Sequence, residues 1–254
     1  MTDLSRLRGP NNQTELAKDL AYLGRAYFNL KLFDEAEISY EESLKLMVEE
    51  KRAGIHILMA KQKLARVKQN NIKYMEDDEE SKKIETFLQE NLVELKKLCK
   101  NQEDYHYALA NAHHQLGRFY QDTRNYEQSH RHLEEAMKIR ETYADDEENI
   151  AIGMINLARN QLLKGECNKK EVEKLLIDSL EIKRKFMSTK NESYQLGLYY
   201  LAVFYRMRGD TTKMKSHQDL LVLDSYQKDF EKYQNECDMA KVLRPEKLWL
   251  HSPE

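Results

Sequence analysis

One 22-residue pattern occurs twice in this chain, and its recurrence is the strongest constraint on the fold. LGRAYFNLKLFDEAEISYEESL runs from Leu23 to Leu44, and LGRFYQDTRNYEQSHRHLEEAM runs from Leu116 to Met137. In each copy, apolar and small residues recur every three or four positions in two stretches, which a polar turn separates. That spacing places each set on one helix face, so each copy predicts a pair of helices. Recurrence at this length predicts an array of stacked pairs.

The small residues of the first copy predict how its two helices meet. Gly24 and Ala36 lie on the facing sides, where small side chains let two backbones approach closely. Tyr27 and Tyr40 are expected to fill the space above and below that contact. Asp34 follows the turn and is expected to cap the second helix.

Weaker copies of the pattern fill the rest of the chain. One begins at Met154 and another at Leu196, and residues 53–100 hold two further helical stretches with an acidic connection between them. A last helical stretch, from about Leu223 to Val242, is expected to cover the end of the array. The predicted fold is therefore all-α, a solenoid of about five helix pairs plus a C-terminal capping helix.

The expected organisation is one continuous array with short ends. Residues 1–12 are expected to form a flexible N-terminus, residues 13–243 a single solenoid, and residues 244–254 a C-terminal tail. The expected helix pairs and cap occupy residues 13–50, 53–100, 105–142, 148–187, 191–222 and 223–243.

Composition supports helices and excludes several classes of partner. The three prolines are Pro10, Pro245 and Pro253, so none interrupts the repeats. The net charge is -3 with both signs mixed, which gives no reason to expect nucleic acid or an acidic membrane as partner. No apolar run is long enough to span a membrane, and the N-terminus lacks a secretory signal. Three separated cysteines are typical of reduced thiols, so we expect a cytoplasmic location, with the nucleus as the alternative.

The repeated residues resemble a known family. Leu-Gly-x-x-Tyr followed by Ala, Tyr and Ser at these intervals resembles tetratricopeptide repeats, which implies a right-handed superhelical solenoid. The longer period and the extension KIRETYADDEEN are similar to the repeats of kinesin light chains, and INLARNQ resembles that family's Asn-Leu-Ala opening. Residues from about 105 to 229 resemble the C-terminal repeats of amyloid protein-binding protein two.

A column of arginines is the main candidate for a binding site. Arg25, Arg118 and Arg159 each follow the small packing residue of their copy, and we expect them to face the concave groove of the solenoid. Arginine suits carboxylates because it donates two parallel hydrogen bonds and keeps its charge when partly buried. The alternative is that each arginine pairs with a nearby acid on the helix surface, at ~0–1 kcal/mol. The last copy departs from the column, with Val203 at this place.

Apolar and aromatic residues are expected to continue the groove toward the later copies. A peptide with an acidic or C-terminal carboxylate end and a hydrophobic anchor would match that gradient. Trp249, the only tryptophan, follows the last helix and is expected either to pack back as a cap or to bind a partner. The complete set of expected groove residues is Arg25, Arg118, Arg159, His114, Asn156, Ile155, Tyr199, Tyr200 and Arg206.

No motif of an enzyme or a metal site accompanies the repeats. Gly24 and Gly117 fall in the middle of helices, where the free N–H groups of a phosphate-binding loop cannot form. His130 and His132 are two residues apart on a helix and therefore point to different faces. Neither they nor His113 and His114 belong to a zinc-binding spacing. We expect no catalytic residue, no metal and no cofactor.

The favoured function is a non-enzymatic scaffold or adaptor that binds a peptide or tail of a partner protein in the concave groove. The resemblance to amyloid protein-binding protein two implies an alternative, the substrate-recognition subunit of a cullin-RING ubiquitin ligase. Docking to such a ligase through an elongin-binding box needs a leucine, a cysteine four residues later and an aliphatic residue four residues later again. Leu163 and Cys167 match the first two places, but Glu171 occupies the third. A motor-cargo adaptor or structural subunit is the third alternative, and the sequence leaves the oligomeric state open.

Overall fold

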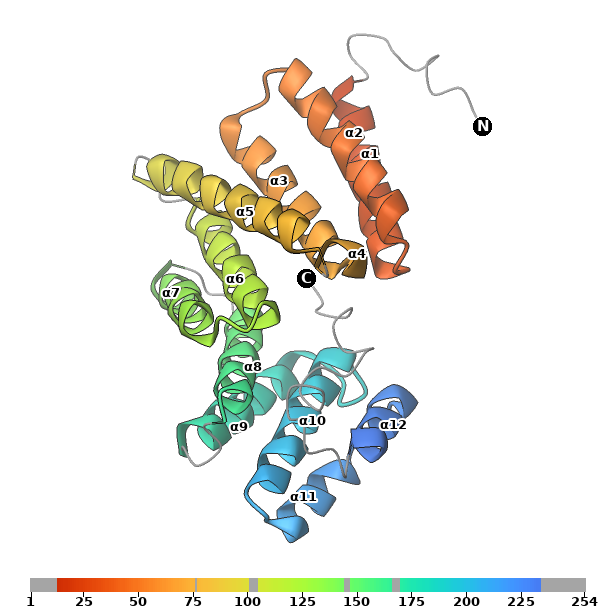
Figure 1. The fold of residues 1–254 in the computed structure, drawn as a ribbon, viewed down its shortest axis with the longest axis vertical. Helices are drawn as coiled ribbons and strands as arrows, with labels where there is room; N and C mark the ends of the chain where they lie inside the picture. The colour runs from red at the N-terminus through yellow and green to blue at the C-terminus, as the bar shows by residue number, and fades with distance from the viewer. Residues whose placement is uncertain (1–12, 76, 101–104, 144–146, 166–169, 234–254) are drawn as a thin grey trace. The chain divides into compact units, whose positions relative to one another are not determined.

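The structure is a computed structural model that describes residues 13–75, 77–100, 105–143, 147–165 and 170–233 (Figure 1). All regular secondary structure in these ranges is helical, and no helix in them combines the length and the apolar character needed to cross a membrane. The helices are α1 (Gln13–Asn29), α2 (Phe33–Glu49), α3 (Gly54–Asn70), α4 (Ile72–Met75), α5 (Asp78–Cys99), α6 (His106–Asp122), α7 (Tyr126–Tyr143), α8 (Glu147–Leu163), α9 (Lys170–Phe186), α10 (Glu192–Met207), α11 (Thr211–Gln218) and α12 (Asp224–Tyr233).

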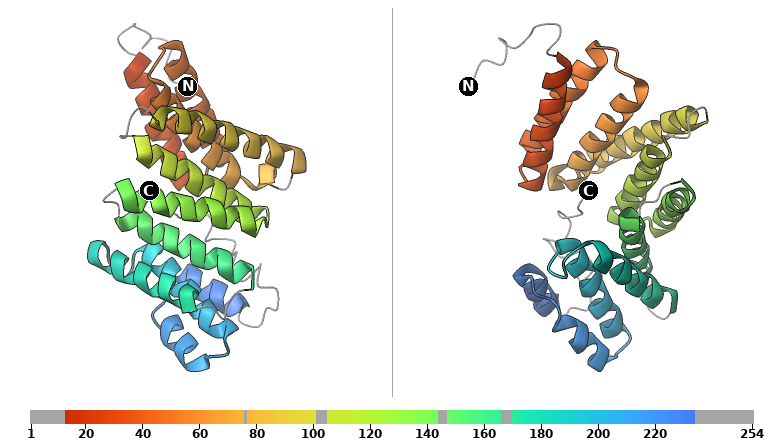
Figure 2. Two further views of the ribbon diagram at one scale, coloured as in Figure 1. Left: turned by 90° about the vertical axis from the view of Figure 1, so that its left-hand side faces the viewer. Right: turned by 180° about the vertical axis from the view of Figure 1, so that it is seen from behind.

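The chain divides into two compact units, Met1–Gln115 and Leu116–Glu254, and the boundary falls within α6. In unit 1, α2 packs against both α1 and α3, and in unit 2 α8, α9 and α10 pack side by side in chain order (Figures 1 and 2). Unit 1 has an apolar core from α1, α2 and α3, made by Phe28, Ala36, Tyr40, Leu64 and Val67. The largest core cluster of unit 2 comes from α8, α9, α10 and α12 and the segment at Leu221.

The first helices of three pairs end in the same way. Lys31, Arg124 and Gly209 adopt left-handed backbone angles, with φ of 65°, 61° and 73°. Directly after Lys31, the N–H of Leu32 donates to the carbonyl of Tyr27 at 2.9 Å, and equivalent bonds follow Arg124 and Gly209. This pattern is the Schellman motif, which satisfies the last carbonyls of a helix and reverses the chain within a few residues. The second helix of each pair can therefore begin at once and run back along the first.

Asp34 does not cap α2, so that prediction is wrong. The helix begins at Phe33, and Leu32 occupies the N-cap position without a side-chain hydrogen bond. Asp34 lies one residue inside the helix, and its carboxylate accepts a hydrogen bond of 3.0 Å from the side-chain amide of Asn71. Because Asn71 follows α3, the carboxylate ties the first pair to the second. By contrast, Asp77 does cap α5, accepting from the N–H groups of Glu79 and Glu80.

Close contact at small residues is confirmed within the α1–α2 pair and the α6–α7 pair. A Cβ atom added to Gly24 would lie 3.0 Å from the ring of Tyr40. At Gly117 the contact is tighter, since an added Cβ would lie 2.6 Å from Cγ of Leu133 and 3.2 Å from its backbone nitrogen. Ala36 is completely buried on the facing side of α2. These contacts hold the two helices of a pair closer together than larger side chains would allow.

The described part of the predicted cap is α12, which packs on α10. The ring centroids of Tyr226 and Phe230 lie 6.1 Å and 5.9 Å from that of Tyr199. Both side chains are almost fully buried, so α12 completes the core of unit 2. The rest of the predicted cap and the tail, which includes Trp249, lie outside the described residues.

Gly117→Ala should destabilise unit 2 because the added methyl group meets both the side chain and the backbone of Leu133. We expect a net loss of about 1–2 kcal/mol in the free energy of unfolding, after the better helix propensity of alanine is counted. Urea unfolding followed by circular dichroism measures it. Gly54→Ala is the matched control, since its nearest neighbour would be 3.9 Å away. Equal stability of the two variants would contradict the packing argument.

Candidate functional site

The arginines of the predicted column lie in two different environments. Arg25 on α1 is exposed and makes no hydrogen bond or ion pair with any residue that the structure describes. Arg118 on α6 and Arg159 on α8 are only 7% and 5% exposed. Their burial contradicts the prediction that they line an exposed groove, and the cause is the packing of neighbouring helices around them.

Arg159 belongs to a buried polar layer between α6 and α8. Its Nη1 donates to Oε1 of Gln121 at 3.3 Å, and its Nη2 lies 4.0 Å from the carboxylate of Asp122, whose side chain is also nearly buried. Gln121 in turn donates to the backbone carbonyl of Asn156 at 2.7 Å. Asn156 is buried as well, and its side-chain amide donates to the carbonyl of Ile152. The hydrogen bonds from Arg159 to Gln121 and from Gln121 to Asn156, with the ion pair to Asp122, join two helix pairs.

The sequence prediction missed one member of the column, Arg66 on α3. It follows Leu64 and Ala65 at 41 residues after Arg25, the same interval that separates Arg118 from Arg159. That interval was the signal that could have identified it. The guanidinium of Arg66 lies over the ring of Phe28 on α1, 4.8 Å from the ring centroid. Such a cation–π contact contributes about 0.5–2 kcal/mol, depending on its exposure.

These contacts follow one rule along the chain. Arg66 meets Phe28, which is three residues after Arg25, and Arg159 meets Gln121, which is three residues after Arg118. In the last copy both members of the equivalent pair are apolar. Val203 and Leu162 are fully buried and belong to the same core cluster. The column is therefore a contact between successive first helices, and its chemistry changes from cation–aromatic to cation–amide to apolar.

The apolar residues predicted for the groove also lie in the core. Ile155, Tyr199 and Tyr200 are 2%, 0% and 3% exposed, and all three belong to the core cluster of unit 2. This contradicts their assignment as groove residues; α12 covers Tyr199 through Tyr226 and Phe230. Of the remaining predicted residues, His114 and Arg206 are half-buried.

The accessible part of the column lies in unit 1, and we call it the arginine surface. It consists of Arg25 and Asn29 on α1 and Arg66 and Asn70 on α3, with Phe28 between the two helices. Arg25 and Asn29 are four residues apart, as are Arg66 and Asn70, so each pair lies on one helix face. Arg25 and Asn29 are exposed, whereas Arg66 and Asn70 are half-buried. The Asn70 amide donates to the carbonyl of Arg66 at 2.7 Å.

Two buried cations hold the ends of second helices in unit 2. Nη1 of Arg140 on α7 donates to the carbonyl of Asn149 at 3.0 Å, which ties the end of α7 to the start of α8. Lys183 on α9 is fully buried, and its ammonium donates to the hydroxyl of Ser193 at the start of α10. Burial lowers the pKa of Lys183 from 10.5 to about 8, and the negative charge of Glu148 acts in the opposite direction.

A second charged cluster fastens α11, a helix without a buried residue, to its neighbours. The hydroxyl of Tyr205 donates to the carboxylate of Glu173 at 2.7 Å, and Lys213 lies 3.4 Å from the same carboxylate. The hydrogen bond from Tyr205 lowers the pKa of Glu173, with a further contribution from Lys213. Burial, together with this bond, raises the pKa of the Tyr205 hydroxyl. These shifts keep Glu173 charged and Tyr205 neutral, which is the state that holds the helices together.

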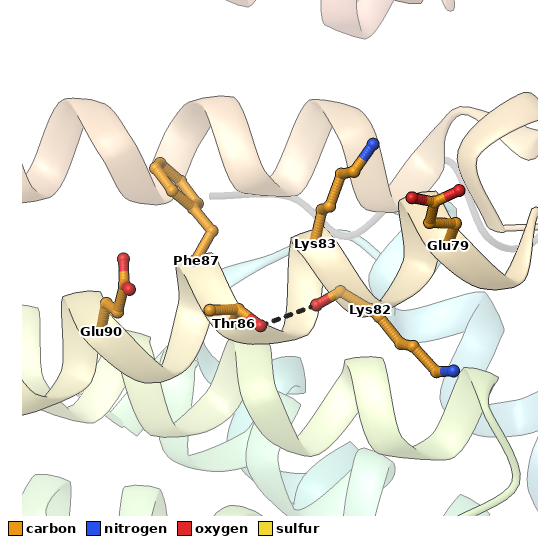
Figure 3. Close-up of a pocket in the computed structure, with 6 residues that line it drawn as sticks. All are labelled: Glu79, Lys82, Lys83, Thr86, Phe87 and Glu90. Carbon is orange, nitrogen blue, oxygen red and sulfur yellow. Dashed lines mark hydrogen bonds between the residues drawn. The ribbon is translucent and has the colours of Figure 1, made fainter.

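One concave feature outside these clusters gives no chemistry. Figure 3 shows a shallow hollow along α5, with Lys83 and Phe87 among the side chains that surround it. Its lining comes from one exposed helix, and Lys83 pairs with Glu80 at 2.7 Å. In the part of the chain that the structure describes, no group of three or more His, Cys, Asp or Glu side chains could hold a metal ion.

Comparison with protein families identifies the repeats. Residues 108–185 and residues 23–46 each match a model described as tetratricopeptide repeat. The chain therefore contains tetratricopeptide repeats, and this repeat type indicates a protein-interaction scaffold. No curated protein sequence matches the chain.

Solved structures share the fold. One solved structure is that of kinesin-light-chain TPR-like repeats from Podosopora anserina, which are nearly identical to one another. It is 19% identical to this chain, with a TM-score of 0.56 over 93% of this chain and all of that one. BtubC (BKLC) from P. vanneervenii is 16% identical, with a TM-score of 0.51 over 100% of this chain and 96% of that one. The Rap protein complexed with Competence and Sporulation Factor is 14% identical, with a TM-score of 0.66 over 95% of this chain and 61% of that one. At these identities the likeness shows an all-α tetratricopeptide-type solenoid; the resemblance to amyloid protein-binding protein two stays a prediction.

Replacing the buried polar layer by its apolar counterpart should be tolerated better than breaking it. Arg159→Val alone leaves Gln121 and Asp122 without their buried cation and should cost about 2–4 kcal/mol of unfolding free energy. Adding Gln121→Leu reproduces the Val203–Leu162 pair, so the double variant should be at least about 1 kcal/mol more stable than the sum of the single effects predicts. Urea unfolding of all three variants measures this coupling. Arg25→Val, at the exposed column position, should change stability by less than about 0.5 kcal/mol. Strictly additive effects at Arg159 and Gln121 would contradict the role of the layer.

The buried ammonium of Lys183 should make stability depend on pH. Because its pKa is about 8 when folded and 10.5 otherwise, the unfolded chain binds more protons between these values, and stability rises with pH across that window. The unfolding free energy of the wild type, measured relative to Lys183→Met, should therefore increase from about pH 7.5 to about pH 10, by up to about 3 kcal/mol. Lys185→Met is the control, since it removes a nearby lysine whose side chain is 60% exposed. A flat difference for Lys183→Met would show that burial does not disfavour its charge.

Proposed function

We propose that the chain is a non-enzymatic scaffold that binds an acidic or carboxylate-bearing segment of a partner protein on the arginine surface of unit 1. One observation carries the proposal: Arg66 is held over Phe28 in the turn of α1 that also presents the exposed Arg25. The tetratricopeptide repeats support the scaffold role, and the binding of a partner segment at this surface goes beyond them.

The chemistry of the arginine surface suits an extended anionic segment. The ring of Phe28 restrains Arg66, which lowers the conformational entropy that the side chain loses on binding an anion. Arg25 is free to move toward the same ligand, and a guanidinium can donate two parallel hydrogen bonds to one carboxylate. Asn29 and Asn70 lie beside these cations, and their amides can both donate to and accept from a peptide backbone.

The surface predicts the character of the complex. Phe28 is only 7% exposed, so the surface itself offers little apolar area to anchor a side chain. Binding should therefore depend on charge, with an affinity that falls as the salt concentration rises. The hydrophobic anchor expected from the sequence has no place here, because the residues assigned to it lie in the core of unit 2.

Reversal of the charge at Arg25 tests the proposal. Affinity capture with quantitative mass spectrometry should identify proteins retained by the wild type and lost with Arg25→Glu. The matched control is Arg131→Glu, which changes an exposed arginine on α7 and should retain the same proteins. Peptides from the acidic segments of those proteins should bind the wild type at least about tenfold more tightly than Arg25→Glu, the loss expected for one charge-assisted contact.

A second substitution separates a binding effect from a change in fold. Arg66→Gln removes the second cation and keeps a polar side chain. Like Arg25→Glu, it should lower the affinity of the chain for the same acidic peptides. Circular dichroism checks that both variants remain helical. If capture is the same for the wild type and both variants, the arginine surface is not the binding site.

A further inference from the structure

The first helix of each later pair presents one face to the second helix of the pair before it. In α8, an added Cβ at Gly153 would lie 2.8 Å from Met137 on α7. Leu157 packs against Met137 and Leu133, and the side chain of Asn160 donates to the carbonyl of Tyr126 at 2.9 Å. Positions 153, 157 and 160 therefore mark the face of α8 on which α7 stacks.

The equivalent positions of α10 and α3 also pack against the preceding second helix. In α10, an added Cβ at Gly197 would lie 2.8 Å from Leu180 on α9, and the next equivalents, Leu201 and Phe204, are almost fully buried. In α3 the corresponding Leu64 and Val67 share a core cluster with Ala36 and Tyr40 of α2. The contact between a second helix and the following first helix thus recurs at α2–α3, α7–α8 and α9–α10.

On α1 the equivalent face is exposed. Its corresponding residues are Asp19, Leu23 and Ala26, and all three are exposed, with Leu23 at 43%. Tyr22 extends the same face, and Leu30 continues it directly after the end of α1; they are 69% and 68% exposed. We call these five residues the α1 stacking face. In the repeat that contains α6 the equivalents of Tyr22 and Leu30 are polar, Gln115 and Thr123, so that repeat does not share the apolar character of these two positions.

The second helices of unit 2 show what chemistry such a face takes. α7 carries Leu133, Met137 and then Arg140, and α9 carries Leu176, Leu180 and then Lys183: two apolar residues four apart, followed three residues later by a cation. Nη1 of Arg140 lies 3.8 Å from the Cβ position of Gly153. At that position α1 has Asp19, so the cation of a helix stacked in this register would meet a carboxylate.

We propose that the α1 stacking face binds an amphipathic helix of a partner protein, which carries two apolar residues four apart and a lysine or arginine three residues further on. The site continues the interface between successive pairs, and it is distinct from the arginine surface on the neighbouring face of α1. A second copy of this chain fits less well, because its last second helix, α11, has one apolar residue, Met214, and therefore lacks the two apolar residues four apart.

A synthetic peptide of α9, KEVEKLLIDSLEIKRKF with a fluorescent label, is the probe, and fluorescence anisotropy with the full chain is the measurement. We expect saturable binding that Leu23→Glu weakens at least about tenfold, since a charge would enter an apolar contact. Ile38→Glu is the matched control: Ile38 is 65% exposed on α2, away from the stacking face, and its substitution should leave binding unchanged. Arg25→Glu should also leave binding of the α9 peptide unchanged, which separates this site from the proposed binding of an acidic segment at the arginine surface.

A charge exchange tests the register. The chain variant Asp19→Lys should bind the α9 peptide several-fold more weakly than the wild type does. A peptide that carries Lys183→Glu should bind the wild-type chain less well and should recover the lost affinity with the Asp19→Lys chain. Leu30→Glu provides a second disruption at a 68% exposed position, in case Leu23→Glu does not fold by circular dichroism.

Three outcomes would overturn the proposal. The first is the absence of saturable binding, and the second is binding that neither Leu23→Glu nor Leu30→Glu weakens. The third is dimerisation of the full chain in light scattering, lost with Leu30→Glu, which would assign the face to a second copy of the chain.

Discussion

Close approach of helices at small residues is the constraint on which the rest of this structure depends. Within a pair, Leu133 packs so close to Gly117 that a Cβ atom at that position would overlap it. Between pairs, Met137 packs in the same way on Gly153, and Leu180 on Gly197. At this separation the side chains that surround each contact are sealed from water, because protein interiors pack without gaps.

The arginine column shows the consequence. A guanidinium that directly follows the small packing residue of its helix is brought against the preceding first helix, and it must find a partner there because an unpaired buried charge is costly. Phe28 supplies a ring for Arg66, and Gln121 supplies an amide for Arg159. Where the contact is fully enclosed, as at Val203 and Leu162, both members are apolar. The same position therefore serves packing in most of the chain.

α1 differs because the described chain places no helix pair before it. Its column residue, Arg25, is exposed for that reason, and so are Tyr22, Leu23 and Leu30 on the adjoining face. Two adjacent surfaces of opposite chemistry result, one cationic and polar, the other apolar with a carboxylate. Residues that elsewhere hold the solenoid together are here available to other molecules. The two proposed binding modes thus derive from one structural cause.

The sequence by itself determined the helices and their pairing. Spacings of three and four, the recurrent Leu-Gly or Leu-Ala step and the absence of internal proline are local properties, and they were enough to predict an all-α repeat solenoid and the close contacts at Gly24 and Ala36. Which predicted site residues reach solvent was decided only by tertiary structure. Arg25 and Arg159 occupy equivalent positions in their repeats, yet one is exposed and the other is 5% exposed. The difference lies in the neighbouring helices, and helical periodicity assigns a residue to a face without saying what will cover that face.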